Sequence, residues 1–167
     1  MKNVIFYNNS AELGGGVFYY NVNFKVFNST YMNNTSYNGG GLFFDCFKHS
    51  ACTGGVTSSN FISNSASFEG GAITWINMQP TISNTTMSGN TALYGNDIAS
   101  FPVAVRTKTA GKVVEIASGQ SVTEAFLFEL IDHYGNVVTK DNSSVGMLLP
   151  YDNYTTVSGN SRVVAVK

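Results

Sequence analysis

Asparagines followed two residues later by serine or threonine are the groups in this sequence best suited to covalent chemistry. In a secreted protein the amide of such a triplet, called a sequon, accepts an N-linked glycan. Six asparagines are candidate glycosylation sites: Asn8, Asn28, Asn33, Asn84, Asn142 and Asn153. A seventh sequon begins at Asn34, whose side chain we expect to be buried and bare. Seven sequons exceed what we expect from chance in a chain rich in Asn, Ser and Thr, and they favour the secretory pathway.

Cys46 and Cys52 are the only cysteines, and they lie in one short segment. In an oxidising compartment they could close a small disulfide-bonded loop; alternatively they are two buried thiols. The sequence leaves both possibilities open. A zinc site is not expected, because His49 and His133 are the only histidines and lie far apart in the sequence. We predict neither a metal nor a cofactor.

Carboxylates are the next groups that could carry chemistry, on polysaccharides in particular. Glycosidases place two carboxylates across one cleft, and lyases combine an acidic calcium cluster with a base. The first hundred residues contain four acids: Glu12, Asp45, Glu69 and Asp97. They occupy different positions within the repeat described below, so we do not expect them to gather. No catalytic residue is predicted.

Composition limits the partners of the chain. Charged residues make up 11% of the 167 residues, well below the usual quarter. A net charge of −1 gives no electrostatic reason to expect nucleic acid or an anionic membrane as partner. The apolar runs are shorter than the roughly 18 residues that a membrane-spanning helix requires. We expect no direct membrane span.

An internal repeat is the strongest pattern in the sequence. Each copy has an aromatic residue or Met, Asn three positions later, a small residue two positions further, and then a Gly-rich triplet. The copies begin at Phe6, Tyr31, Phe61 and Met87, so they are 25, 30 and 26 residues apart. Repeats of this length are typical of solenoids, in which each copy forms one coil.

Alternating apolar and polar residues between the copies predict short strands rather than helices. Equivalent residues of parallel coils would lie one above another, roughly 4.8 Å apart. The aromatic residues would stack inward, and the repeated asparagines would form a hydrogen-bonded ladder at a corner where Asn tolerates positive φ. The predicted ladder residues are Asn9, Asn34, Asn64 and Asn90. The solenoid is expected to cover residues 1–101 in about four coils.

Two short motifs at a fixed offset connect the repeat to a known family. Phe61-Ile-Ser-Asn64 and Gly70-Gly71-Ala72-Ile73 resemble the paired FxxN and GGA[IV] motifs of polymorphic outer membrane protein repeats. Copies one and two carry Gly-Gly-Gly, and copy four carries Gly95-Asn96-Asp97, a departure that suits a terminal coil. The resemblance covers residues 1–100 and implies a right-handed parallel β-helix of the pectin-lyase-like kind. It also implies surface display with a role in adhesion or scaffolding.

After residue 101 the repeat stops, and evenly spaced strands with polar turns predict an immunoglobulin-like β-sandwich over residues 102–167. Asp132-His-Tyr-Gly135-Asn136-Val-Val138 resembles the D-x-x-G-N-x-V hairpin of filamin-like and bacterial immunoglobulin-like repeats. About 65 residues are fewer than the roughly 100 of a complete sandwich, so we expect it to be incomplete. Either the chain is an excerpt of a longer protein, or a neighbouring copy donates the missing strand and builds a fibre.

The predicted function is structural: a non-catalytic rigid stalk or filament subunit of an extracellular or cell-surface glycoprotein. The predicted partners are N-linked glycans and copies of the chain itself. A first alternative is an adhesin that binds carbohydrate or a cell-surface protein through solenoid loops, above all the long loop Asp45–Gly55. A second alternative is a fragment of a polysaccharide lyase or hydrolase. Trp75, the only tryptophan, is either a core residue or an exposed platform for a sugar ring.

Overall fold

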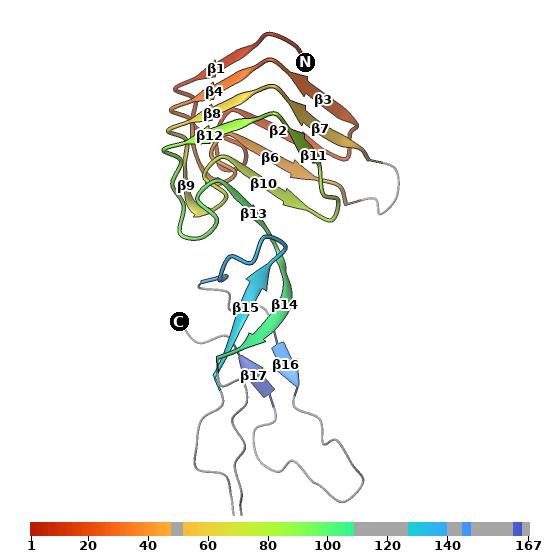
Figure 1. The fold of residues 1–167 in the computed structure, drawn as a ribbon, viewed down its shortest axis with the longest axis vertical. Coiled ribbons are helices and arrows are strands. Elements are labelled where there is room, and N and C mark those ends of the chain that lie inside the picture. The colour runs from red at the N-terminus through yellow and green to blue at the C-terminus, as the bar shows by residue number, and fades with distance from the viewer. Residues whose placement is uncertain (48–51, 109–126, 140–144, 148–161, 165–167) are drawn as a thin grey trace, which may run out of the picture.

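A computed structural model describes residues 1–47, 52–108, 127–139, 145–147 and 162–164. Every regular element in these ranges is a β-strand, which confirms the predicted all-β class (Figure 1). Among the described residues there is accordingly no helix long and apolar enough to cross a membrane.

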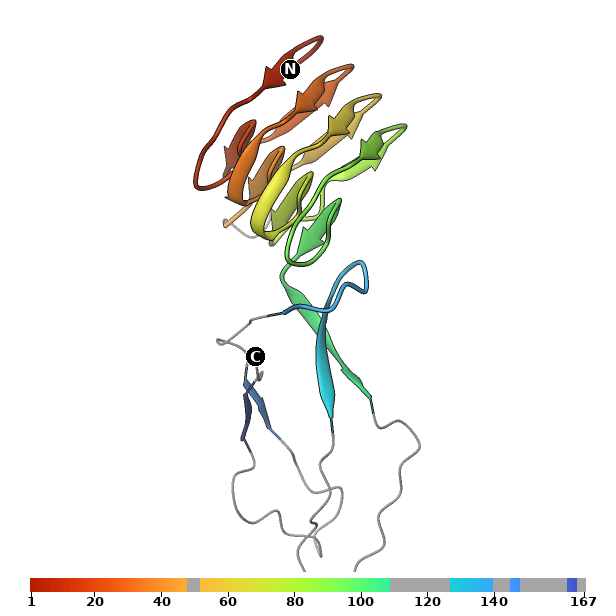
Figure 2. The same ribbon diagram turned by 90° about the vertical axis from the view of Figure 1, so that its left-hand side faces the viewer.

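The first hundred residues wind into a parallel β-solenoid of about four coils, stacked one on another (Figure 2). One sheet contains β1 (Ile5–Tyr7), β4 (Thr30–Met32), β8 (Asn60–Ile62) and β12 (Thr86–Ser88). A second contains β2 (Val17–Tyr20), β6 (Leu42–Asp45), β10 (Ile73–Ile76) and β13 (Ile98–Ser100). A third contains β3 (Phe24–Phe27), β7 (Gly54–Thr57) and β11 (Thr81–Ser83), and β5 (Thr35–Asn38) pairs with β9 (Ser65–Glu69).

The register of these sheets follows the sequence repeat. Phe6 pairs with Tyr31, Tyr31 with Phe61, and Phe61 with Met87, all in parallel strands. The residues that begin the four copies are therefore stacked, as predicted. The solenoid of about four coils is confirmed.

Left-handed backbone conformations turn the chain at the corners of each coil. The corner after the first sheet is occupied in successive coils by Asn8, Asn33, Ser63 and Gly89, with φ of 56°, 54°, 52° and 65°. Glycine and asparagine enter this region most readily. The expectation that the ladder asparagines themselves occupy the left-handed region was wrong by one residue. The residue before each ladder position makes the turn, and this leaves the following side chain pointing inward.

The corner before the second sheet depends on glycine. Gly39 has a φ of 66°, and a Cβ at this position would lie 2.5 Å from the carbonyl oxygen of Leu42. No larger residue fits there without moving the backbone. The glycine triplets of the repeat therefore allow backbone segments to lie close together at this corner.

Inward-facing side chains fill the solenoid in columns. The rings of Phe6 and Tyr31 stack with centroids 4.8 Å apart, and those of Tyr31 and Phe61 with centroids 4.5 Å apart. Tyr31 and Phe61 are fully buried. Stacked aromatic pairs add about 0.5–1.5 kcal/mol to the gain from burying their area. The column holds adjacent coils in one register.

The described residues after position 101 form two small antiparallel sheets. β14 (Pro102–Thr107) pairs with β15 (Phe128–Asp132), and β16 (Val145–Met147) pairs with β17 (Arg162–Val164). The predicted immunoglobulin-like sandwich is not confirmed, because the described residues show only these two-stranded sheets.

Candidate functional site

The repeated asparagines form a continuous ladder of hydrogen bonds through the coils. The backbone N–H and the Nδ2 of Asn34 both donate to Oδ1 of Asn64, at 3.0 and 2.9 Å. Asn9 donates to Asn34, and Asn64 to Asn90, in the same way. Asn34 Nδ2 also donates to the carbonyl of Phe6, in the preceding coil, at 3.0 Å. Each interior amide thus uses both donors and its acceptor, so full burial leaves it satisfied.

The last coil ends the ladder with two residues that the sequence analysis did not assign to it. Asn90 Nδ2 donates to Oδ1 of Asp97 at 3.0 Å, so Asp97 takes the place of a fifth ladder asparagine. Asn96 Oδ1 accepts from the backbone N–H of Ala92 at 3.0 Å. The break of the glycine pattern in copy four was the sequence signal for this cap.

The sequon asparagines divide by exposure as the ladder requires. Four candidates are exposed at corners of the coils and have positive φ: Asn8, Asn28, Asn33 and Asn84. Asn34, by contrast, is 0% exposed. Asn142 and Asn153 lie outside the described residues. The structure therefore leaves one set of asparagines exposed and buries another between the coils. Two of the exposed amides also reach the neighbouring coil, because Asn28 Nδ2 donates to Oδ1 of Asn3 at 2.9 Å and Asn84 Nδ2 donates to Oγ of Ser58 at 3.0 Å.

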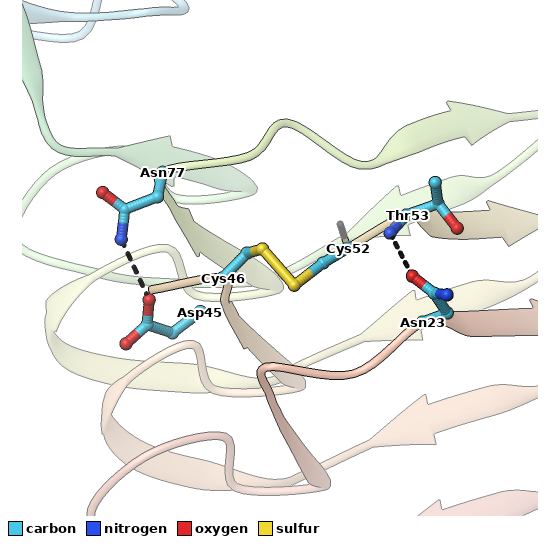
Figure 3. The surroundings of a disulfide bond; sticks show 6 residues. All are labelled: Asn23, Asp45, Cys46, Cys52, Thr53 and Asn77. Atoms are coloured by element: carbon cyan, nitrogen blue, oxygen red, sulfur yellow. Dashed lines mark hydrogen bonds between the residues drawn. A yellow bond between two sulfur atoms is a disulfide. The ribbon is translucent and has the colours of Figure 1, made fainter. Parts of the chain in front are cut away.

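A disulfide joins Cys46 and Cys52 between the end of β6 and the start of β7 (Figure 3). Both side chains are buried in the core cluster. The bond closes the segment that makes the second copy of the repeat longest. Residues 48–51 within it, including His49, lie outside the described residues.

Side-chain hydrogen bonds hold the two stems of this loop. On one side Asn77 Nδ2 donates to Oδ1 of Asp45 at 3.1 Å, and on the other the N–H of Thr53 donates to Oδ1 of Asn23 at 2.6 Å (Figure 3). Phe47, directly after the first cysteine, is 64% exposed. The stems are therefore fixed to neighbouring coils, and the loop carries an aromatic side chain into solvent.

The turn after β15 is bonded to the last coil. Asp132 is 2% exposed, and its Oδ1 accepts the backbone N–H groups of Tyr134 and Asn136 at 2.9 and 2.8 Å. Its Oδ2 accepts the N–H of Ser100, the last residue of β13, at 3.2 Å. Asn136 Nδ2 donates to the carbonyl of Ile98 at 3.0 Å. The Asp and Asn of the D-x-x-G-N motif thus form the turn and attach it to the solenoid.

Trp75 is a core residue rather than an exposed sugar platform. Its side chain is 8% exposed and belongs to the core cluster of the coils. Its Nε1 donates to the hydroxyl of Tyr134 at 2.9 Å, so the indole N–H has a partner in the turn after β15.

A buried carboxyl group lies near this junction. Glu69 is 0% exposed, and its Oε2 accepts a hydrogen bond from the Tyr94 hydroxyl. Among the described residues, Oε1 of Glu69 and Oδ1 of Asn38, its partner in the adjacent coil, are both buried without a hydrogen-bond partner. Burial raises the pKa of Glu69, and the charge of Asp132 raises it further, although the bond from Tyr94 acts in the opposite direction. A proton on Oε1 of Glu69 would replace one unpartnered acceptor by a donor.

A shallow groove of about 550 Å³ lies between the last coil and the turn after β15. Asn96 and Asp97 line it from the coil, and Tyr134 and Asn136 line it from the turn. Amide and carboxylate groups beside an aromatic ring are suited to sugar hydroxyls and sugar faces.

The acidic residues of the coils do not meet in one place. Glu12 is exposed, and Glu69 is buried. Asp45 bonds to Asn77 of the next coil, and Asp97 bonds to Asn90 of its own coil. Within the described ranges no three His, Cys, Asp or Glu side chains are grouped so that they could hold a metal ion.

Similarity to known proteins provides no functional assignment for this chain. Comparisons with protein-family models, with curated proteins and with solved structures find no match. The resemblances to polymorphic outer membrane protein repeats and to filamin-like repeats therefore stay predictions.

Proposed function

We propose that the chain is a non-catalytic structural module, a rigid stalk or filament subunit of an extracellular or cell-surface glycoprotein. The observation that carries this proposal is the ladder from Asn9 to Asn90, which bonds each coil to the next through amides that are buried from Asn34 onward, and which ends on Asp97. A solenoid whose coils contact only their neighbours transmits its stiffness along one axis. A stalk or filament needs that property.

The compartment is supported by the disulfide and the exposed sequons together. Disulfides persist in oxidising environments, outside the cytosol. Asn8, Asn28, Asn33 and Asn84 present their side chains to solvent at corners, where a bulky glycan meets no core residue. We infer that these four carry N-linked glycans.

Finer features of the fold belong to the same proposal. We infer right-handed winding of the coils, because parallel crossover connections are right-handed in about 98% of cases. We also infer that residues 102–167 form an incomplete immunoglobulin-like sandwich.

The test is to secrete the full chain from eukaryotic cells, map its glycopeptides and image it by electron microscopy, beside native material. Rods or filaments with glycans at the four corner asparagines are expected. Dispersed round particles at high concentration in both preparations, or native protein without any glycan, would contradict the proposal.

An adhesin is the second candidate, favoured by the groove between Asp97 and Tyr134 and by the exposed Phe47 of the disulfide loop. A glycan array separates the two sites. Reproducible binding that is lost in F47S identifies the loop, and binding that is lost in L93S, at an exposed groove residue outside the ladder, identifies the groove. An array without binding removes carbohydrate as the ligand of such an adhesin.

A further inference from the structure

The ladder asparagine of the second coil, Asn34, begins a sequon although its side chain is buried in the folded protein. Asn34 is followed by Thr35 and Ser36, which completes the triplet. In the other copies the residue two positions after the ladder asparagine is alanine: Ala11, Ala66 and Ala92. Asn34 is therefore the only ladder position that a glycosylating enzyme would recognise.

A glycan on Asn34 is incompatible with the folded coil. Its Nδ2 donates to Oδ1 of Asn64 at 2.9 Å and to the carbonyl of Phe6 at 3.0 Å, so both amide protons are engaged. The residue is 0% exposed. A sugar on Nδ2 would remove one of these protons and would place a bulky group inside the coil.

The residue directly before it has the opposite character. Asn33 is exposed in the left-handed corner, with a φ of 54°, and Thr35 completes its own sequon. We propose that glycosylation of Asn33 protects Asn34 from modification and so keeps the ladder able to form. This inference rests on the proposed passage of the chain through the secretory pathway.

The chemistry is a competition between adjacent acceptors on the unfolded chain. Nδ2 of Asn33 forms a bond to the anomeric carbon of an oligosaccharide carried on a lipid diphosphate. The bond between that carbon and the diphosphate breaks, the diphosphate leaves with the electron pair, and the amide loses one proton. The attached glycan then occupies the space next to Asn34, so the same reaction cannot follow there.

Two substitutions separate the overlapping sequons. T35V removes the Asn33 sequon and keeps that of Asn34, and valine preserves the β-branched side chain of this exposed strand residue. S36A removes only the Asn34 sequon, and alanine already occupies the equivalent position in coils one and three as Ala11 and Ala66.

The experiment secretes the full chain as wild type, T35V, S36A and the double variant from eukaryotic cells, and measures yield and glycopeptides. Wild type and S36A should carry a glycan on Asn33 and none on Asn34. T35V should gain a glycan on Asn34 and lose secreted yield several-fold, because destabilised chains are removed in the cell. The double variant should regain the wild-type yield.

Three outcomes would overturn the inference: a glycan on Asn34 in folded wild type, a bare Asn34 in T35V, or a double variant as poorly secreted as T35V. Material made without glycosylation in the bacterial periplasm provides the folding control, and there T35V and wild type should unfold at the same temperature. Failure of the proposed function looks different, because no sequon would then be occupied in native protein.

Discussion

The asparagine side chain suits the ladder because it carries two donors and one double acceptor on a short stem. Aspartate lacks the donors, and glutamine places its amide one methylene further from the backbone. In Asn34 and Asn64 the backbone N–H and the amide bond the same oxygen of the next coil, so backbone and side chain share one partner. The buried positions depend on this match.

N64A should lower the free energy of unfolding by about 2–4 kcal/mol, because it leaves buried donors of Asn34 without an acceptor. N9A is the matched control, since Asn9 is exposed at the first rung. This variant should lose less than about 1 kcal/mol of unfolding free energy. Urea denaturation measures both. Equal losses in the two variants would show that the buried rungs contribute no more than the exposed one.

The buried carboxyl of Glu69 predicts a pH dependence. Its folded-state pKa is raised above the ordinary 4.5, so its contribution to stability is fully present below that value and is lost as pH rises through the folded pKa. E69Q stays neutral and replaces the unpartnered Oε1 by an N–H donor. The variant should therefore match wild type near pH 4 and be more stable by about 1–3 kcal/mol near pH 8.

The control for this variant is E12Q, because Glu12 is exposed in the first coil. It should leave the pH profile of thermal unfolding unchanged. E69Q that is less stable than wild type at every pH would show that Glu69 is ionised and satisfied in the folded protein.

At the scale of elements, the long connection between β6 and β7 is held by a covalent bond. Cys46 and Cys52 are six positions apart in the sequence and are both buried. Hydrogen bonds at both stems anchor the loop to coils one and three. The disulfide thus joins the end of β6 covalently to the start of β7 across the long connection.

Replacing both cysteines by serine should lower stability by about 2 kcal/mol, the chain-entropy effect of so short a loop. Thermal unfolding of the variant and of reduced wild type checks this, and both should melt at similar, lower temperatures than the oxidised protein. An unchanged melting temperature after complete reduction would mean that the stems alone fix the loop.

At the scale of the whole molecule, Asp132 connects the solenoid to the antiparallel hairpin of β14 and β15. Its buried carboxylate accepts four hydrogen bonds, one from the backbone of β13, two from the backbone of its own turn and one from the Asn136 side chain. The turn then presents Tyr134 to Trp75 of the third coil. The solenoid and the hairpin are therefore joined by polar contacts beside a small apolar cluster that contains Tyr94 and Val138.

D132A should release the turn from the solenoid while the coils keep their β-structure. Because Trp75 is the only tryptophan, its fluorescence reports the change, and its emission should shift to longer wavelength as water reaches the indole. Y134F removes only the Trp75 hydrogen bond and should produce a smaller shift. Unchanged emission in D132A, with unchanged circular dichroism, would show that the turn stays docked without its carboxylate.

Much of the first half of the chain was predictable because its residues recur in phase. Phe6, Tyr31 and Phe61 stack, and Asn34 and Asn64 bond, since parallel strands one repeat apart must place equivalent side chains above one another. The residue that ends the ladder was harder to predict from the sequence. Asp97 appeared only as a break in the pattern, and its use as a final acceptor depends on where the chain goes next.

The sequence by itself determined the number of coils, their register and which asparagines face inward, because a periodic pattern encodes contacts that repeat along the chain. Only the tertiary structure decided the contacts that occur once: Asp97 as the last rung, Glu69 beside Asn38, and Trp75 bonded to Tyr134, 59 positions later. A contact between segments that do not repeat leaves no period in the sequence, so its partners are fixed by how the folded segments meet.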